Sequence, residues 1–104
     1  NQIVSSMPRY KMYPTKNINI LLKLDTATGK VWMIQYGTGD NIGISVPVDD
    51  SSLLYSWDIV QAGRFELYPT ENIFNFILLD TQLGNTYQVQ WHTKENSRMR
   101  VRIY

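Results

Sequence analysis

The sequence of 104 residues contains no cysteine and only one histidine, His92. Without cysteine the chain can form neither a disulfide scaffold nor a thiolate metal site. Ten basic and nine acidic side chains give a net charge of +1, so no overall attraction to nucleic acid or to a membrane surface is expected. No apolar run approaches the roughly 18 residues of a membrane-spanning helix. We therefore expect a soluble domain with no cofactor, no nucleic-acid partner and no membrane span.

One domain (1–104) suits a chain of this length, because roughly 65% of the unfolded surface can be buried at this size without cross-links. The chain begins with Asn1 rather than methionine. Removal of a leader would produce such a start and favours a secreted or periplasmic protein, although a shortened chain would begin in the same way.

The chain contains an internal repeat. Residues 9–49 align without gaps on residues 64–104 at a constant offset of 55 residues, and fourteen aligned positions are identical. The identities include an initial arginine, a Tyr-Pro-Thr turn and a Leu-Asp-Thr run. Such a period indicates one supersecondary unit built twice. The expected organisation is a tail (1–8), two repeats and a connector (50–63).

Apolar side chains alternate with other residues over four short runs in each repeat. Period two is the pattern of a half-buried strand, so we expect four strands per repeat. Because the phase is kept, we expect both repeats to bury the same face. In the first repeat this face carries Tyr10, Met12, Ile18, Ile20, Leu22, Leu24, Trp32, Ile34, Tyr36, Ile44, Val46 and Val48. In the second it carries Phe65, Leu67, Ile73, Ile77, Leu79, Tyr87, Val89, Trp91, Met99, Val101 and Ile103.

A turn of the form Asp-Thr-x-x-Gly follows the second run in both repeats, beginning at Asp25 and at Asp80. Its carboxylate can accept hydrogen bonds from turn amides and its glycine can adopt a positive φ, so each motif predicts a hairpin. The connector 50–63 has no counterpart in the repeat. A short helix would place Leu53, Trp57 and Val60 on one face, while an extra strand or an ordered loop fits nearly as well.

The run from Leu24 to Trp32 resembles the strand-turn-strand hairpin of β-propeller blades. The larger pattern, which ends in an aromatic at Tyr36 or Trp91, is similar to that of uncharacterised small two-repeat bacterial β-proteins. Neither resemblance implies an activity. Small trimeric lectins, whose chains each supply two propeller blades, are similar in size and duplication, and this similarity concerns architecture alone.

We predict an all-β fold with two four-stranded antiparallel meander repeats related by pseudo-twofold symmetry, forming a small barrel or packed sheets. The alternative is two blades of an oligomeric propeller. In either case each repeat must bury apolar surface against its twin or against further copies.

Catalytic chemistry has few candidates in this sequence. A Ser-His-Asp arrangement would need His92, but the aligned position of the first repeat is Gly37, so a solvent-facing turn residue is the simpler interpretation. Asp25 and Asp80 occupy equivalent turns, where capping explains them without a metal or a glycosidase pair. We therefore expect no catalytic residue and no metal site.

Two charged groups have equally simple interpretations. An acidic group near the connector lacks the spacing of an EF-hand, so we interpret it as a solvated loop. An arginine strip near Lys94 in the last run could meet phosphates, but charge on an edge strand also guards against aggregation, which we favour. The acidic group is Asp40, Asp49 and Asp50, and the strip is Arg98, Arg100 and Arg102.

Aromatic side chains make up 12% of the chain and could stack on sugars. A carbohydrate site would use strand-end aromatics beside amides such as Gln35 and Gln90, although the phase of these aromatics also fits the core. Tyr55 and Trp57 lie outside the repeat, which makes them better candidates for a binding surface. The strand-end aromatics are Trp32, Tyr36, Tyr87 and Trp91.

The second run differs between the repeats at its outward positions. These positions are Asn19, Leu21 and Lys23 in the first repeat and Phe74, Phe76 and Leu78 in the second. Burial of the three apolar side chains is worth roughly 6 kcal/mol at about 2 kcal/mol each, so the connector or another chain should cover them.

We therefore predict a non-enzymatic protein-binding or assembly module, whose partner is another protein or a second copy of the chain. Its contact surface would be Phe74, Phe76 and Leu78, joined by Tyr55 and Trp57. The alternative is a carbohydrate-binding module with a glycan partner. A hydrolase or metal-dependent enzyme is the third hypothesis, and it requires a pocket that joins His92 to a carboxylate.

Overall fold

A computed structural model describes residues 7–37 and 43–104 of the chain. Its regular elements are eight strands and one short 3-10 helix, which confirms the all-β prediction. No helix in the described part of the chain is long and apolar enough to cross a membrane. The elements are β1 (Tyr10–Pro14), β2 (Ile20–Asp25), β3 (Val31–Gln35), β4 (Ile44–Asp49), β5 (Phe65–Pro69), β6 (Asn75–Asp80), β7 (Thr86–Gln90), η1 (Glu95–Ser97) and β8 (Met99–Ile103).

Each repeat forms one antiparallel meander. Sheet 1 has the order β1-β2-β3-β4 and sheet 2 the order β5-β6-β7-β8. The register repeats at the offset of the sequence alignment, since Ile20 pairs with Gln35 and Asn75 with Gln90. A bulge between Val31 and Trp32 opposite β4 is a local difference. The predicted pair of four-stranded meanders is confirmed.

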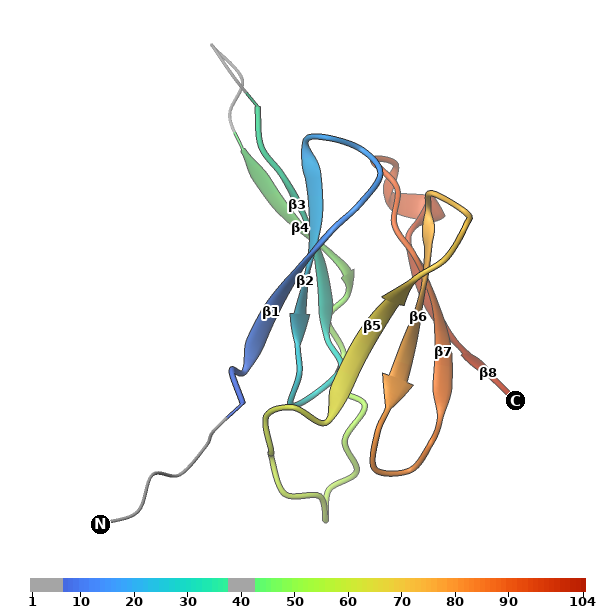
Figure 1. The fold of residues 1–104 in the computed structure, drawn as a ribbon. Helices are drawn as coiled ribbons and strands as arrows, with labels where there is room; N and C mark the ends of the chain where they lie inside the picture. The colour runs from blue at the N-terminus through green and yellow to red at the C-terminus, as the bar shows by residue number, and fades with distance from the viewer. Residues whose placement is uncertain (1–6, 38–42) are drawn as a thin grey trace.

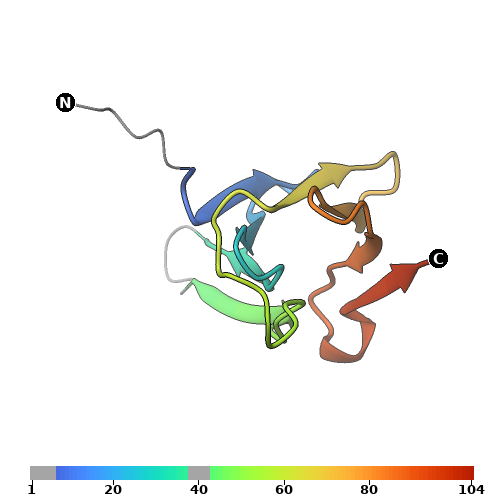
Figure 2. The same cartoon turned by 90° about the horizontal axis from the view of Figure 1, so that it is seen from below.

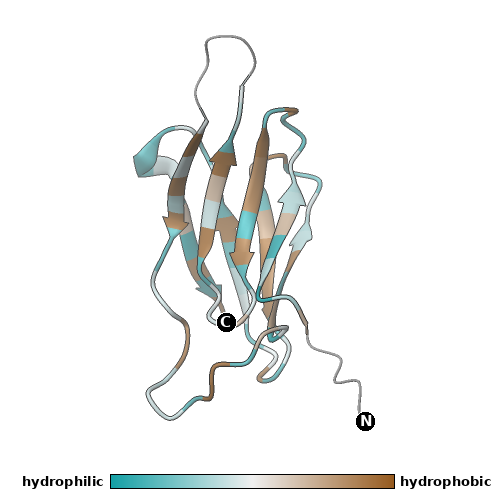
Figure 3. Cartoon of the chain, turned by 90° about the vertical axis from the view of Figure 1, so that its left-hand side faces the viewer, coloured by the Kyte–Doolittle hydropathy of each residue, from teal (hydrophilic) through white to brown (hydrophobic). Residues whose placement is uncertain are grey.

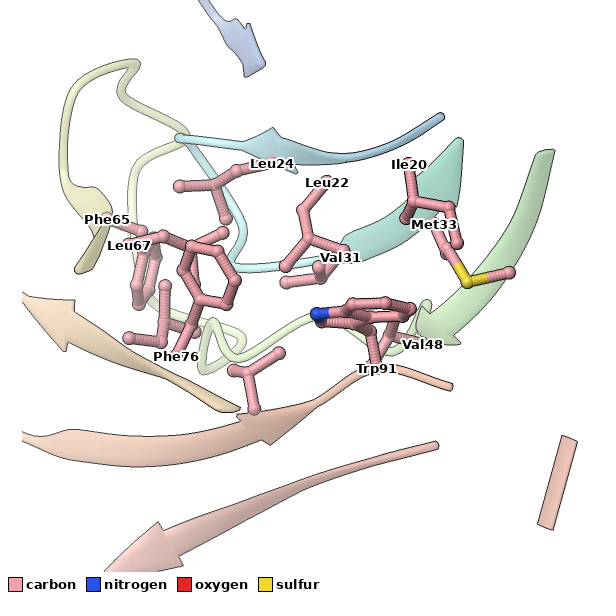
Figure 4. Packing of buried hydrophobic residues seen from close by; sticks show 12 residues of the cluster. Ile20, Leu22, Leu24, Val31, Met33, Val48, Phe65, Leu67, Phe76 and Trp91 are labelled. Carbon is pink, nitrogen blue, oxygen red and sulfur yellow. The ribbon is translucent and has the colours of Figure 1, made fainter. Parts of the chain in front are cut away.

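The two sheets pack against each other and do not close into a barrel. Strands β1 and β5 run in the same direction on one side of the molecule, and β4 and β8 lie together on the opposite side (Figures 1 and 2). One cluster of buried apolar side chains fills the space between the sheets (Figure 4). Packed sheets are therefore confirmed, and the barrel is wrong.

The two sheets bury opposite faces of the repeat. In β2 the buried apolar residues are Ile20, Leu22 and Leu24, and in β6 they are Phe76 and Leu78. These two β6 residues align with Leu21 and Lys23, which point away from the core of sheet 1. A twofold axis would give both sheets the same contact surface. The predictions of one shared core face and of pseudo-twofold symmetry are therefore wrong.

Pairing between neighbouring strands explains the error. Residues opposite each other in an antiparallel pair share a face. Leu22 pairs with Met33 and Leu24 with Val31, so Trp32 lies on the other face of sheet 1. Ile18 precedes β2 and is exposed. Both faces carry apolar residues, and alternation within one strand does not say which face is buried.

The connector 50–63 is a loop, which confirms one of the three alternatives that the sequence left open, and the short helix and the extra strand are wrong. Leu53 and Leu54 pack against the core cluster. The Leu53 amide donates to the Thr28 carbonyl at 2.8 Å. The connector therefore covers the hairpin turn of the first repeat and holds the two sheets together.

Candidate functional site

The outward face of sheet 1, opposite the core, carries large apolar and aromatic side chains. Tyr10 and Met12 are 51% and 49% exposed. The rings of Tyr10 and Trp32 lie 6.4 Å apart, and the Lys23 ammonium sits 4.8 Å from the Trp32 ring centre. Figure 3 views the molecule from this side and shows apolar bands on the strands. This surface, the B face of sheet 1, comprises Tyr10, Met12, Leu21, Lys23, Trp32 and Ile34.

The outward face of sheet 2 mixes apolar and amide side chains. Val101 and Ile103 are 46% and 44% exposed. The Gln88 side-chain amide donates to the Asn75 side-chain oxygen at 2.7 Å, so part of this face is a polar ladder. This surface, the A face of sheet 2, comprises Asn75, Ile77, Leu79, Thr86, Gln88, Val101 and Ile103.

Both outward faces are counterparts of surfaces that are buried inside the molecule. The same letters name the aligned faces of the other sheet: the B face of sheet 2 carries the residues aligned with the B face of sheet 1, and the A face of sheet 1 those aligned with the A face of sheet 2. These two aligned faces pack against each other in the core. The exposed B face of sheet 1 aligns with Phe65, Leu67, Phe76, Leu78, Tyr87 and Val89. The exposed A face of sheet 2 aligns with Ile20, Leu22, Leu24, Val31, Met33, Val46 and Val48. The molecule therefore ends, on each side, in a surface of the kind that forms its own core.

At the start of each repeat, the same geometry joins an arginine to the hairpin aspartate. Arg64 forms two hydrogen bonds with Asp80, at 3.0 and 2.9 Å, and Arg9 forms two with Asp25, both at 3.2 Å. The side chain of Arg64 is 2% exposed and that of Arg9 is 48% exposed. The difference arises because the connector and sheet 1 cover the second pair, where Asp58 also approaches Arg64 at 3.4 Å.

The electrostatics of the two aspartates follow from these contacts. Burial alone would raise the pKa of the Asp80 carboxyl, but hydrogen bonds from Arg64 and from the Gln82 and Leu83 amides hold it below its usual value. Burial, Arg9 and the Ala27 amide act in the same way on the pKa of Asp25, which is also lowered. The aspartates cap their turns as predicted, and in addition they bind arginine.

Two contacts between the sheets join a lysine of the first repeat to the aligned glutamate of the second. The Lys11 ammonium meets the Glu66 carboxylate at 3.3 Å, and the Lys16 ammonium donates to the Glu71 carbonyl at 3.2 Å. Because strands β1 and β5 run in the same direction on one side of the molecule (Figure 1), these lysines of the first repeat lie beside the aligned glutamates of the second.

The hairpin turns are in different surroundings although their sequences match. The Phe65 amide donates to the Thr26 carbonyl at 2.9 Å, and Gly63 donates to the Thr26 hydroxyl at 2.9 Å. The turn of the first repeat is therefore buried. In the second repeat Thr81 is exposed, as is Leu83 at the tip of the turn.

The predicted contact residues of the second repeat are not on the surface. Phe76 is 3% exposed and Leu78 is 0% exposed, because sheet 1 covers them. Phe74 is partly buried and packs 5.1 Å from the ring of Trp91. The prediction that Phe76 and Leu78 form an accessible contact surface is wrong, since their burial partner is the first repeat rather than the connector or another chain.

Tyr55 and Trp57, by contrast, are exposed on the connector. Their rings stack in parallel with centroids 4.8 Å apart and an interplanar angle of 1°. The Asp58 carboxylate accepts a hydrogen bond from the Tyr55 amide at 2.8 Å, which fixes the turn between the two rings. The structure brings these two predicted residues together, away from Phe74.

The four strand-end aromatics are not gathered in one place. Trp91 is buried, and its indole N–H donates to the Ile73 carbonyl at 3.0 Å. Trp32 and Tyr36 belong to the other sheet, where Tyr36 is exposed and donates to the Ile18 carbonyl at 3.2 Å. Tyr87 is partly buried against the core.

His92 lies beside the core rather than beside a carboxylate. Its ring stacks on Phe74 at 5.1 Å, and its Nδ1 accepts a hydrogen bond from the Lys94 amide at 3.0 Å. Within residues 7–37 and 43–104, no hydrogen bond or ion pair joins His92 to a carboxylate, and no three potential metal ligands cluster. Asp40 of the predicted acidic group lies outside the described residues.

The arginine strip of β8 reaches back to the rest of the molecule. Arg100 donates to the carbonyls of Gly29 and Ser51 at 2.8 and 3.1 Å and pairs with Asp49 at 3.4 Å. Burial lowers the pKa of its guanidinium, although the Asp49 charge opposes this shift. Arg98 donates to the Pro47 carbonyl at 3.1 Å. Two of the three arginines therefore link the sheets instead of guarding an edge.

Sequence reasoning missed the arginine–aspartate pairs and the two outward faces. The pairs carried a signal, because Arg9 and Arg64 are identical aligned residues, each 16 positions before an identical aspartate. For the outward faces, the sequence held no signal other than the apolar residues on both sides of the strands. A scan of protein-family models gives no match to the chain, and neither curated proteins nor solved structures give one.

Proposed function

We propose that this chain is a non-enzymatic protein-binding and assembly module that makes contact through its two outward sheet faces. The supporting observation is the exposure of half of Tyr10 and Met12 on one face and nearly half of Val101 and Ile103 on the other. Each of these four side chains has apolar neighbours on its own face, so each face is an apolar patch rather than an isolated side chain.

The free energy at stake is large for a domain of this size. Complete burial of a large apolar side chain stabilises by about 2 kcal/mol, so covering the exposed halves of Tyr10, Met12, Val101 and Ile103 contributes roughly 4 kcal/mol. Part of that gain offsets the loss of translational and rotational freedom on association. Two such faces on one chain favour repeated protein contact over a free existence in water.

Sedimentation velocity over a wide range of concentration tests the proposal. The wild-type chain should exceed its single-chain mass of 12.1 kDa as the concentration rises. The variant Met12→Asp/Val101→Asp should remain a single chain, because it places a charge on each face. Val60→Asp is the matched control, since Val60 is an exposed valine on the connector. A wild-type chain that stays single at every concentration would contradict the proposal.

Glycan binding is a second candidate function, and the stacked rings of Tyr55 and Trp57 favour it. A planar exposed aromatic surface suits the apolar face of a pyranose. Titration with oligosaccharides, followed by tryptophan fluorescence, should show saturable binding that Trp57→Ala removes and Trp32→Ala keeps. Equal responses of the two variants would exclude the connector as the glycan site.

A further inference from the structure

We infer that the partner of each outward face is the opposite face of a second copy of this chain, in a head-to-tail arrangement. The inference rests on the proposed function and adds the identity and the orientation of the partner. The A face of sheet 2 in one copy would pack on the B face of sheet 1 in the next copy.

The first argument is the interface already present inside the molecule. Sheet 1 gives its A face to the core and sheet 2 gives its B face, so the internal contact joins unlike faces. The faces that remain exposed are the B face of sheet 1 and the A face of sheet 2. A head-to-tail contact between copies joins these two, so it also pairs an A face with a B face. A contact between two identical faces would need a packing that the chain does not use internally.

Charge complementarity is the second argument. Inside the molecule, Lys11 faces Glu66 at the aligned position of the neighbouring sheet. The contact between copies joins sheet 2 of one copy to sheet 1 of the next copy. Glu66 of the first copy would therefore face Lys11 of the second. At this position lysine and glutamate therefore alternate along successive sheets, so the contact between copies brings opposite charges together.

Backbone groups at the hairpin turns provide the third argument. The Thr26 carbonyl accepts from the Phe65 amide inside the molecule. The aligned groups are the Thr81 carbonyl of one copy and the Tyr10 amide of the next copy. In the head-to-tail contact these two groups would face each other. Thr81 and Leu83 are exposed in the single chain, and the next copy would cover them as sheet 2 covers the turn at Thr26.

The polar residues of the two outward faces also correspond. On the B face, Lys23 replaces the buried Leu78, and on the A face amides and a hydroxyl replace buried apolar residues. An ammonium can donate to amide and hydroxyl oxygens, so these replacements suit each other across one contact. The contact between copies is more polar than the core, as expected for chains that fold separately. The A-face replacements are Asn75 for Ile20, Thr86 for Val31 and Gln88 for Met33.

Repeated head-to-tail contacts give a ring when the rotation from one sheet to the next closes, and a filament when it does not. The ring corresponds to the oligomeric propeller that the sequence left as an alternative. In both products every copy uses both of its outward faces.

A complementation experiment tests the orientation. Met12→Asp blocks the B face and leaves the A face intact, and Val101→Asp does the opposite. Each variant alone should sediment as a single chain of 12.1 kDa. A mixture should form a dimer of one copy of each variant, about twice that mass, and nothing larger. Circular dichroism checks that each variant is folded. If Met12→Asp is unfolded, Tyr10→Asp blocks the same face, and Ile103→Asp serves in the same way for Val101→Asp.

The outcomes separate this inference from the proposed function. If the wild-type chain associates but either variant alone still dimerises, identical faces meet, so the inference is overturned and the assembly function stands. If the wild type associates but the mixture stays as single chains, the inference is overturned in the same way. A wild-type chain that never associates contradicts both.

Discussion

The two hairpin turns with the motif Asp-Thr-x-x-Gly show how one sequence pattern meets two surroundings. Both turns bind an arginine through two hydrogen bonds and both are closed by a glycine with positive φ. The turn at Asp25 is covered by the connector and by β5, whereas the turn at Asp80 faces solvent beyond the aspartate itself. Local structure therefore follows the motif, and burial follows the neighbouring sheet.

The largest difference in the free energy of unfolding between aligned substitutions should appear at two aromatic positions, one in β5 and one in β1. Phe65→Ala should lower the free energy of unfolding by about 3–5 kcal/mol, because it leaves a cavity between the sheets. Phe65 is fully buried, and its counterpart Tyr10 is half exposed. Tyr10→Ala should cost much less in chemical denaturation of dilute protein. Equal losses at the two positions would contradict the opposite burial of the faces.

The next largest difference in folding free energy should appear between the Arg64–Asp80 and Arg9–Asp25 ion pairs. Asp80→Asn leaves the buried Arg64 guanidinium with only the more distant Asp58, and it should cost about 3 kcal/mol of folding free energy. Asp25→Asn should cost less, since half-exposed Arg9 can turn to water. Urea denaturation of both variants measures the two losses. A larger loss for Asp25→Asn would reverse the comparison.

The turn glycines offer a smaller and sharper comparison. Gly29 and Gly84 have φ values of 82° and 77°, so alanine strains either backbone by roughly 1 kcal/mol. A Cβ at Gly29 would lie 2.6 Å from the Leu53 Cδ1, whereas a Cβ at Gly84 meets nothing within 4 Å. Gly29→Ala should therefore cost roughly 2 kcal/mol, about twice the loss at Gly84. Thermal unfolding that gives equal losses would show that the connector does not press on the first turn.

The smallest expected effect is the dependence of stability on pH. Both aspartates have a lower pKa in the folded chain than the value of about 3.9 expected when unfolded. Their stabilisation is complete above about pH 4 and is lost as the pH falls through the folded-state values. The variant Asp25→Asn/Asp80→Asn should show a flatter decline of unfolding free energy in acid. An unchanged decline would mean that other carboxylates are responsible.

The strands, turns and meander order could be read from the sequence because they depend on local patterns. Alternation located the strands, and the glycine and aspartate of each turn located the hairpins. The buried face could not be read, because Leu21 and Ile20 are both apolar and only the neighbouring sheet distinguishes them. The same ambiguity misplaced the contact surface at Phe76, whose extra apolar character serves the core between the sheets.

Thiol labelling at aligned positions tests the opposite burial of the two repeats most directly, because the chain has no cysteine of its own. Single cysteines would replace Leu22, Ile77, Lys23 and Leu78, and the protein would be labelled at a dilution where sedimentation shows single chains. We expect slow labelling at positions 22 and 78 and fast labelling at their counterparts 77 and 23. Equal rates within each aligned pair would contradict the head-to-tail relation of the two sheets.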